Sequence, residues 1–232
     1  MTDWFSAPGM WPAIWLTLRL AFVSSLVLLL VGVPLANWLN TTRTRGVVLL
    51  ETLVSLPIVL PPTVIGFYLL MLMSPQHAAG AAWLSVFGTP LPFSFAGLVL
   101  GSVVYSLPFA VQPFQAAFRA VRPDTVRAGL ALGLTPRQVF WSVVLPLSRH
   151  GILTGVSLSF AHTMGEFGVV LMLGGNIPGQ TRVASIALYD EAQKLNYGAA
   201  NGYALVLLAI SFAILVGIAV LQRRQHAIFL AR

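Results

Sequence analysis

Residues 52–73 read TLVSLPIVLPPTVIGFYLLMLM and contain no Lys, Arg, Asp or Glu. They open a run of 67 residues without such a charge, which continues to residue 118. A helix needs about 20 apolar residues to cross the hydrocarbon core of a bilayer. The run fits two crossings, because residues 74–92 (SPQHAAGAAWLSVFGTPLP) interrupt it with Pro, Gly, Gln and His. The sequence therefore predicts an integral membrane protein.

Three further apolar stretches lie on either side of this run. Residues 20–42 and 195–222 are also free of charge, and residues 150–173 are interrupted only by Glu166. Each stretch fits one crossing. We therefore expect an all-α membrane protein with about five transmembrane helices and one membrane domain over residues 1–232. The expected spans are roughly 11–38, 47–73, 93–117, 149–173 and 198–221.

The composition supports this class and excludes others. Hydrophobic residues make up 57% of the 232 residues and charged residues only 8%, whereas soluble domains carry roughly 25% charged residues. Too few charges are present to cover a water-soluble surface, so soluble, disordered and coiled-coil classes are excluded. The chain has no Cys, which excludes disulfides and Cys-ligated metal sites.

The positive charges predict the orientation. Ten of the thirteen Lys and Arg residues fall in connections, or in the tail, on one side of the predicted spans: Arg43, Arg45, Arg119, Arg122, Arg127, Arg137, Arg149, Arg223, Arg224 and Arg232. Positive charge gathers on the cytoplasmic side. The N-terminus is therefore expected in the periplasm and the C-terminus in the cytoplasm. The net charge of +7 then reflects orientation, and no nucleic-acid partner is expected.

Motifs for catalysis are absent from the sequence. The lone lysine, Lys194, follows Gln193 rather than Gly, so the chain has no P-loop, and it has neither an HExxH nor a GxSxG motif. His162 and Glu166 are four residues apart and would share a face of a helix. Either they form a metal or proton site or, as we favour, a polar pair inside the bundle. We expect neither an enzyme nor a metal site.

The connection over residues 119–148 is the longest on the basic side. Pro123 and Asp124 are typical of a helix start. The residues that follow include Ala128, Gly129 and Gly133, which would let the helix approach another surface closely. Pro136 begins a second helix. On these residues alone, the segment is either an interfacial linker or a docking surface.

Part of this connection matches a family motif. Arg127-Ala128-Gly129, then Gly133, and after nine intervening residues Val143-Val144-Leu145-Pro146 resemble the pattern EAAxxxG(x9)IxLP. That pattern marks the permease subunits of binding-protein-dependent ABC importers. The chain departs from it at Arg127, where the family has Glu, and at Gly129, where it has Ala.

Two more segments resemble one branch of this family. Residues 56–66 (LPIVLPPTVIG) are similar to the LPLVLPPxVxG stretch of molybdate permeases. Residues 165–168 (GEFG) and 175–179 (GNIPG) are similar to stretches that molybdate permeases largely share with sulfate permeases. The compact length favours the molybdate branch, with tungstate as a related cargo. A sulfate or thiosulfate permease remains the alternative.

The resemblance implies a complex in a bacterial inner membrane. It implies a homodimer of this chain, two cytoplasmic ATPase subunits that bind ATP and Mg, and a periplasmic oxyanion-binding protein. The chain itself would bind no cofactor. A helix over residues 124–133 would couple it to the ATPase, within a coupling loop that includes Asp124, Arg127, Ala128, Gly129, Gly133, Leu145 and Pro146. An ATP-independent anion channel or secondary transporter is disfavoured, because Asp and Lys are absent from the spans.

Two groups of residues are candidates for the transport path and for its support. Pro57, Pro61 and Pro62 each remove a backbone donor, so with Gly66 they are expected to kink the second span. We expect this kink to line the dimer axis as a gate, with a static kink as the alternative. His162, Gly165, Glu166 and Gly168 form a candidate structural polar site. Glu166 would fix the bend between the two glycines, or pair with His162 or Arg19.

Overall fold

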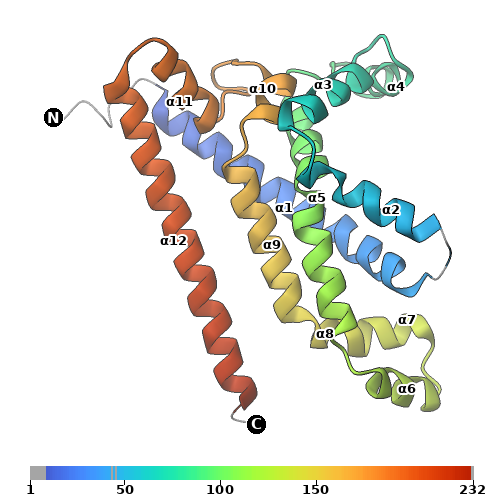
Figure 1. The fold of residues 1–232 in the computed structure, drawn as a ribbon. Helices are drawn as coiled ribbons and strands as arrows, with labels where there is room; N and C mark the ends of the chain where they lie inside the picture. The colour runs from blue at the N-terminus through green and yellow to red at the C-terminus, as the bar shows by residue number, and fades with distance from the viewer. Residues whose placement is uncertain (1–8, 43, 45, 231–232) are drawn as a thin grey trace.

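The computed structural model describes residues 9–42, 44 and 46–230, with side chains described as far as residue 220. Every regular element in these residues is a helix (Figure 1). Three helices are long and apolar enough to cross a membrane: α1 (Met10–Thr41), α5 (Phe95–Arg119) and α12 (Tyr197–Leu230). Two bent helix pairs bring the number of candidate spans to five. The predicted all-α membrane fold is confirmed.

The second span is a broken helix. It consists of α2 (Gly46–Ser55), the short 3-10 helix η2 (Leu56–Ile58) and α3 (Pro62–Met73). The span bends by 113° between its two arms. Pro61 and Pro62 lack the N–H groups that a continuous helix would need, and Leu60 N–H donates back to the Leu56 carbonyl over 3.1 Å. The prolines thus produce the bend that the sequence predicts.

The fourth span is broken where the sequence predicts a bend between Gly165 and Gly168. The helix α9 (Arg149–Met164) ends there and α10 (Gly168–Gly174) starts after the break, so residues 149–173 do not form one continuous helix. At the break, Gly165 N–H donates to the His162 carbonyl and Glu166 N–H to that of Thr163, at 3.2 and 3.3 Å. These i to i−3 bonds tighten the last turn and stop the helix.

The helices α1, α5 and α9 form the central bundle. Phe114 of α5 is fully buried at its centre. Gly32 of α1 and Gly155 of α9 leave the space for this ring: a Cβ added at these glycines would lie 3.1 and 2.6 Å from it. The bundle core is therefore set by one aromatic side chain packed between two glycines.

The remaining helices lie at the two ends of the bundle (Figure 1). At one end are α4 (Ala78–Phe87), α10 and α11 (Ala184–Gln193); at the other are α6 (Pro123–Ala131) and α7 (Pro136–Val139). Arg43, Arg45 and Arg232, three of the residues used to predict the orientation, lie outside the described residues, as do the side chains of Arg223 and Arg224.

A cluster of ion pairs lies around α11, at one end of the bundle. Arg182 contacts Asp190 at 2.5 Å and Glu191 at 3.6 Å, and Lys194 contacts the same two carboxylates at 2.9 and 3.3 Å. The hydrogen bond from Lys194, together with the charges of Lys194 and Arg182, lowers the pKa of Asp190. The cluster ties α11 to the loop that precedes it.

Candidate functional site

The α3 arm of the broken span packs closely on α10. A Cβ at Gly66 would lie 2.8 Å from the Met172 Cβ, and one at Gly168 would lie 2.7 Å from the Pro62 Cβ. Real Cβ atoms essentially never approach that closely. The structure therefore brings together Pro62 and Gly66, predicted as gate residues, with Gly168, predicted as part of a structural bend.

The α2 arm is attached to α5 by polar side chains. The Glu51 Oε1 atom accepts hydrogen bonds from Gln115 Nε2 at 2.8 Å and from Arg119 at 3.0 Å. One turn further along α2, Ser55 Oγ accepts a hydrogen bond from Gln112 Nε2 at 3.2 Å. Sequence analysis missed these contacts. A signal was available, because Glu51 is a lone acid that immediately precedes the longest uncharged run.

Arg119 extends this network to a third helix. Its Nε atom donates to Asn40 Oδ1 of α1 over 3.0 Å, so the ends of α1, α2 and α5 meet at one guanidinium. The Arg119 and Glu51 side chains are 58% and 34% exposed. Water can compete for such groups, and exposed ion pairs are worth only about 0–1 kcal/mol. The network therefore positions α2 relative to α5, and breaking these contacts would cost little free energy.

A polar cluster joins α5 and α9 in the middle of the bundle. Ser106 Oγ lies 2.9 Å from His162 Nδ1 and 3.0 Å from Thr163 Oγ1. The His162 ring stacks on Phe109, with 3.9 Å between ring centroids, and contacts Tyr105 at 4.8 Å. His162 is thereby fixed by one hydrogen bond and two rings.

Glu166 lies beyond this cluster, and the expected contact of its side chain with His162 or Arg19 is not formed. The residue is 4% exposed, and in the part of the chain that the structure describes neither carboxylate oxygen has a hydrogen-bond partner. The expected pair with His162 fails because α9 ends at Met164, so the two residues do not share a helical face. Arg19 instead lies over the Phe95 ring at 4.4 Å. Within the described residues no three His, Asp or Glu residues gather in a way that could hold a metal ion.

The backbone around Glu166 is anchored to α11. Ser185 Oγ donates to the Glu166 carbonyl oxygen over 2.7 Å, and the Ser102 hydroxyl of α5 lies beside the Glu166 carboxyl group. Gly165, on one side, is exposed, whereas Gly168, on the other, is buried against α3. The break between α9 and α10 thus directs the acid inward.

The predicted coupling loop forms a compact helical unit. It contains α6, α7, the π-helix η3 (Phe140–Val144) and α8 (Leu145–Leu147). Gly129 of α6 is buried, and a Cβ there would lie 3.2 Å from Val139 Cγ2. Gly133 follows α6 with φ of +85°, a conformation that favours glycine. Pro146 is the second residue of α8, which continues directly from the π-helix η3.

The polar residues of α6 face outward. Asp124 lies in the first turn, and its carboxylate is 3.7 Å from Arg127 and 3.9 Å from Arg122. All three side chains are at least 74% exposed, so these ion pairs contribute little to stability. Ala128 is exposed as well. This surface of α6 is free within the described chain.

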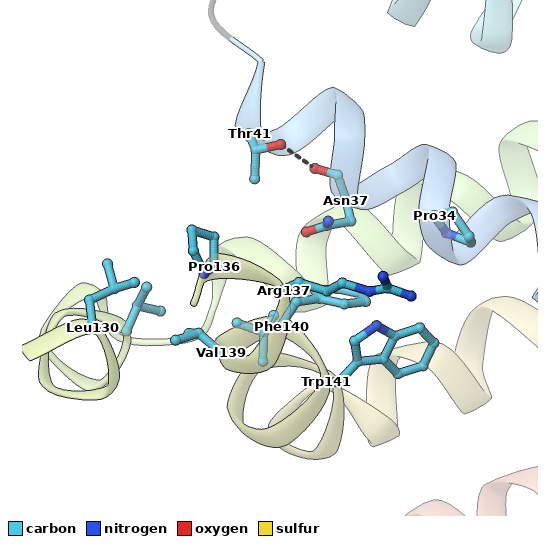
Figure 2. A pocket seen from close by; sticks show the side chains of 11 residues that line it. Pro34, Asn37, Thr41, Leu130, Pro136, Arg137, Val139, Phe140 and Trp141 are labelled. Atoms are coloured by element: carbon cyan, nitrogen blue, oxygen red, sulfur yellow. Dashed lines mark hydrogen bonds between the residues drawn. The ribbon is translucent and has the colours of Figure 1, made fainter. Parts of the chain in front are cut away.

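A groove separates the coupling loop from the end of α1 (Figure 2). Its volume is about 520 Å³. In Figure 2 the Arg137 side chain extends between Asn37 of α1 and Trp141 of η3. The groove is lined by residues of α1, α6, α7 and η3: Pro34, Asn37, Thr41, Val126, Leu130, Pro136, Arg137, Val139, Phe140, Trp141 and Val144. Beside this groove the loop is attached to the bundle through η3 and α8: Phe140, Val144 and Leu145 pack against the core of α1 and α5, and the Phe140 ring lies 5.6 Å from the Phe118 ring.

Comparison with known proteins places this arrangement in a defined group. Residues 29–227 match the family described as binding-protein-dependent transport system inner membrane component. The chain is 46% identical over 203 residues to the molybdenum transport system permease protein ModB of Azotobacter vinelandii, covering 88% of this chain and 90% of that protein. It is 36% identical over 208 residues to the sulfate transport system permease protein CysT of Escherichia coli K12, covering 90% and 75%.

A solved structure shares the fold. The chain matches a bacterial alginate ABC transporter that was crystallised in complex with an alginate pentasaccharide-bound periplasmic protein. The TM-score is 0.77 at 20% identity, with 96% of this chain and 81% of that chain covered. At this level of identity the likeness concerns the fold alone.

Proposed function

The chain belongs to the family of binding-protein-dependent transport system inner membrane components, and we propose that it is the subunit that moves molybdate through an ATP-driven importer. It is a multi-pass inner-membrane permease of the ABC type, and its relatives are permease subunits rather than enzymes. The 46% identity to a molybdenum permease over 88% of the chain carries the choice of cargo. Tungstate, a similar oxyanion, is included in this proposal.

The proposed complex contains two copies of this chain and two cytoplasmic ATPase subunits. The lone lysine of the chain is outside any P-loop, so ATP and Mg²⁺ would be bound by the ATPase. A periplasmic binding protein would deliver the oxyanion and supply most of the specificity. The shared fold with a transporter crystallised with its periplasmic protein supports such an assembly.

We place the end that carries α6 and α7 in the cytoplasm. Five arginines (Arg119, Arg122, Arg127, Arg137 and Arg149) lie at this end, as the positive-inside rule requires. The exposed surface of α6, with Asp124, Arg127 and Ala128, would contact the ATPase. Its buried side, at Gly129, rests on Val139. Leu145 and Pro146 begin the helix that passes motion on to α9.

The broken second span is proposed to act as the gate of an alternating-access cycle. Pro57, Pro61 and Pro62 keep its two arms from joining into one helix. The α3 arm is seated on α10 at Gly66, whereas the α2 arm is held by exposed polar contacts to α5. We infer that α2 moves and that α3 stays with α10.

Sulfate is the second candidate cargo. The chain is 36% identical to a sulfate permease over 90% of its length, and sulfate and molybdate are both tetrahedral dianions. A channel or secondary transporter would work without an ATPase. Asp and Lys, which could couple an ion gradient to transport, are absent from the spans.

Reconstitution tests the function directly. The chain would be purified with its ATPase and placed in liposomes with the binding protein outside and ATP inside. We expect uptake of labelled molybdate that depends on ATP and on the binding protein, and little competition by sulfate. Equal uptake without ATP would support a channel or secondary transporter. Competition by sulfate at equal concentration would move the assignment to sulfate.

A further inference from the structure

The contact between Ser106 and His162 lies at mid-membrane depth. Ser106 is the twelfth residue of α5, which has 25 residues. At 1.5 Å per residue it is about 17 Å from the start of that helix. His162 bonds to Ser106, so its imidazole occupies the same depth. A polar side chain in this position is a functional candidate, since polar groups are costly there.

One face of α5 and α9 at this depth is open and partly polar. Tyr105, Phe109 and Gln112 recur along α5 at helical spacing; the first two are half-buried and Gln112 is exposed. On α9, His162 is half-buried and Leu158, one turn away, is 43% exposed. Lipid cannot satisfy such hydrogen-bonding groups. This face must therefore lie against protein or water.

The backbone beside His162 favours water. The helix α9 ends two residues later, at Met164, and Gly165 is exposed in the break. Irregular backbone at membrane depth is tolerated only where it is buried in protein or lines a water-filled cavity. The exposed positions of α12 differ, since they include Leu208, Phe212 and Leu215, which suit lipid.

The His162 imidazole is held so that its Nδ1 atom is hydrogen-bonded and its Nε2 atom is available to a ligand. The ring is stacked on Phe109 and in contact with Tyr105, and Nδ1 bonds to Ser106 Oγ. Nε2 makes no hydrogen bond within the described part of the chain. If Thr163 donates to Ser106 and Ser106 donates to Nδ1, the ring proton resides on Nε2. Nε2–H is then a fixed donor on the open face.

We propose that this face of α5 and α9 lines the transport path and that His162 Nε2–H donates a hydrogen bond to the oxyanion as it passes. The inference rests on the proposed function and names a contact within the path. A neutral donor suits an anion that must bind and then leave, since strong binding would stop passage. The nearby acid is not displayed on the surface of this face, because Glu166 is only 4% exposed.

Thiol labelling tests whether the face is wet. The chain has no Cys, so His162→Cys introduces a single thiol, studied in the complex with ATPase and binding protein. A charged methanethiosulfonate reagent should modify it, and molybdate supplied with the binding protein and ATP should slow the reaction. Leu208→Cys, 67% exposed on α12, is the control and should stay unmodified. Equal, slow labelling of both thiols would overturn the proposal.

Substitution at the same position tests the hydrogen bond. Loss of a hydrogen bond to a charged group costs about tenfold or more, so His162→Leu should lower molybdate uptake by about tenfold. ATP hydrolysis stimulated by the loaded binding protein should persist, so that transport per ATP falls. His162→Gln retains an N–H donor and should transport better than His162→Leu. Leu208→Ala, on α12 and outside this face, should leave both readouts unchanged.

The outcomes separate this inference from the proposed function. Wild-type uptake by His162→Leu would overturn the inference alone. Parallel loss of uptake and of ATP hydrolysis in His162→Leu and in His162→Gln would also overturn it, because that pattern indicates a structural role. If His162→Leu fails to assemble, the labelling of His162→Cys decides. Absence of molybdate uptake by the wild-type complex would instead overturn the proposed function, and the inference with it.

Discussion

The two arms of the broken second span are held by opposite kinds of contact. The α3 arm meets α10 through Gly66 and Gly168, where backbone approaches so closely that even a methyl group would collide. The α2 arm meets α5 through Glu51, whose partners Gln115 and Arg119 reach it from partly exposed positions. One contact depends on shape and the other on hydrogen bonds.

These two kinds of contact respond differently to motion. Close packing is lost as soon as the surfaces separate, since dispersion falls steeply with distance. Exposed hydrogen bonds and ion pairs are exchanged for bonds to water at a cost of about 0–1 kcal/mol. The comparison indicates that the α3 arm is a fixed support and the α2 arm the moving part. Three variants that change the arms or the hinge between them would test this difference, and a fourth lies outside both arms.

The largest effect is expected at the fixed arm. In Gly168→Leu the new side chain collides with Pro62, whose Cβ is only 2.7 Å from the added Cβ position. Overpacking typically costs about 1–3 kcal/mol and more where backbone must shift. We expect a clear loss of thermal stability in detergent, which tryptophan fluorescence during heating would measure. Gly217→Leu, at an α12 position with nothing within 4 Å, is the matched control. Equal melting of both variants would contradict close packing as the support.

The next largest effect concerns the hinge between the arms. Replacing Pro61 and Pro62 with Ala restores two backbone donors, and each proline disfavours a continuous helix by about 3 kcal/mol. The double variant should assemble but favour a straighter span, so uptake should fall by about tenfold or more. Pro75→Ala, in the loop after α3, controls for proline loss in general. Wild-type uptake by an intact complex would sink the gating role.

A smaller effect is expected at the moving arm. Glu51→Gln keeps an acceptor for Gln115 but removes the charge that faces Arg119. Because exposed ion pairs contribute at most about 1 kcal/mol, stability should change little and basal ATP hydrolysis should rise by up to about fivefold. Glu191→Gln, in the cluster at the other end, should leave basal hydrolysis unchanged. A large drop in melting temperature for Glu51→Gln would show that this arm is a support as well.

The smallest effect is expected in the ion cluster at α11, which belongs to neither arm. The hydrogen bond from Lys194 is the first cause of the lowered pKa of Asp190. A lowered folded-state pKa gives stability above the unfolded value of about 3.9, lost as pH falls through the folded value. Melting curves between pH 7 and pH 3 should show less acid loss for Asp190→Asn than for wild type. Identical pH profiles would remove the cluster as a source of stability.

Residues with strong local signals predicted much of this architecture. The uncharged runs located the membrane helices, and Pro123 marked the start of α6, because a proline is favoured in the first turn of a helix. Pro61 and Pro62 predicted the bend in the second span, since a missing backbone donor acts wherever the chain folds.

Other features depend on distant parts of the chain. Gly165 and Gly168 indicated a bend in the fourth span, but hydropathy continues through residues 168–173 and did not show that the helix stops there. This break removes the expected pair between His162 and Glu166, which required an unbroken helical face. The contact between Glu51 and Arg119 joins residues far apart in the chain, and helix crossing alone brings them together.

The last helix carries a consequence for how this chain can change over time. Along α12 the buried positions end at Tyr203, and beyond them the side chains described are exposed or half-exposed. Val206, Leu207 and Ile210 still pack against the core near Tyr203, but at the exposed positions one apolar residue serves as well as another for packing within this chain. Mutations can therefore accumulate along most of α12 with little penalty, while the glycines that meet α10 tolerate almost none. We therefore expect sequence variation among relatives to be greatest along α12, although it is the longest helix of the fold.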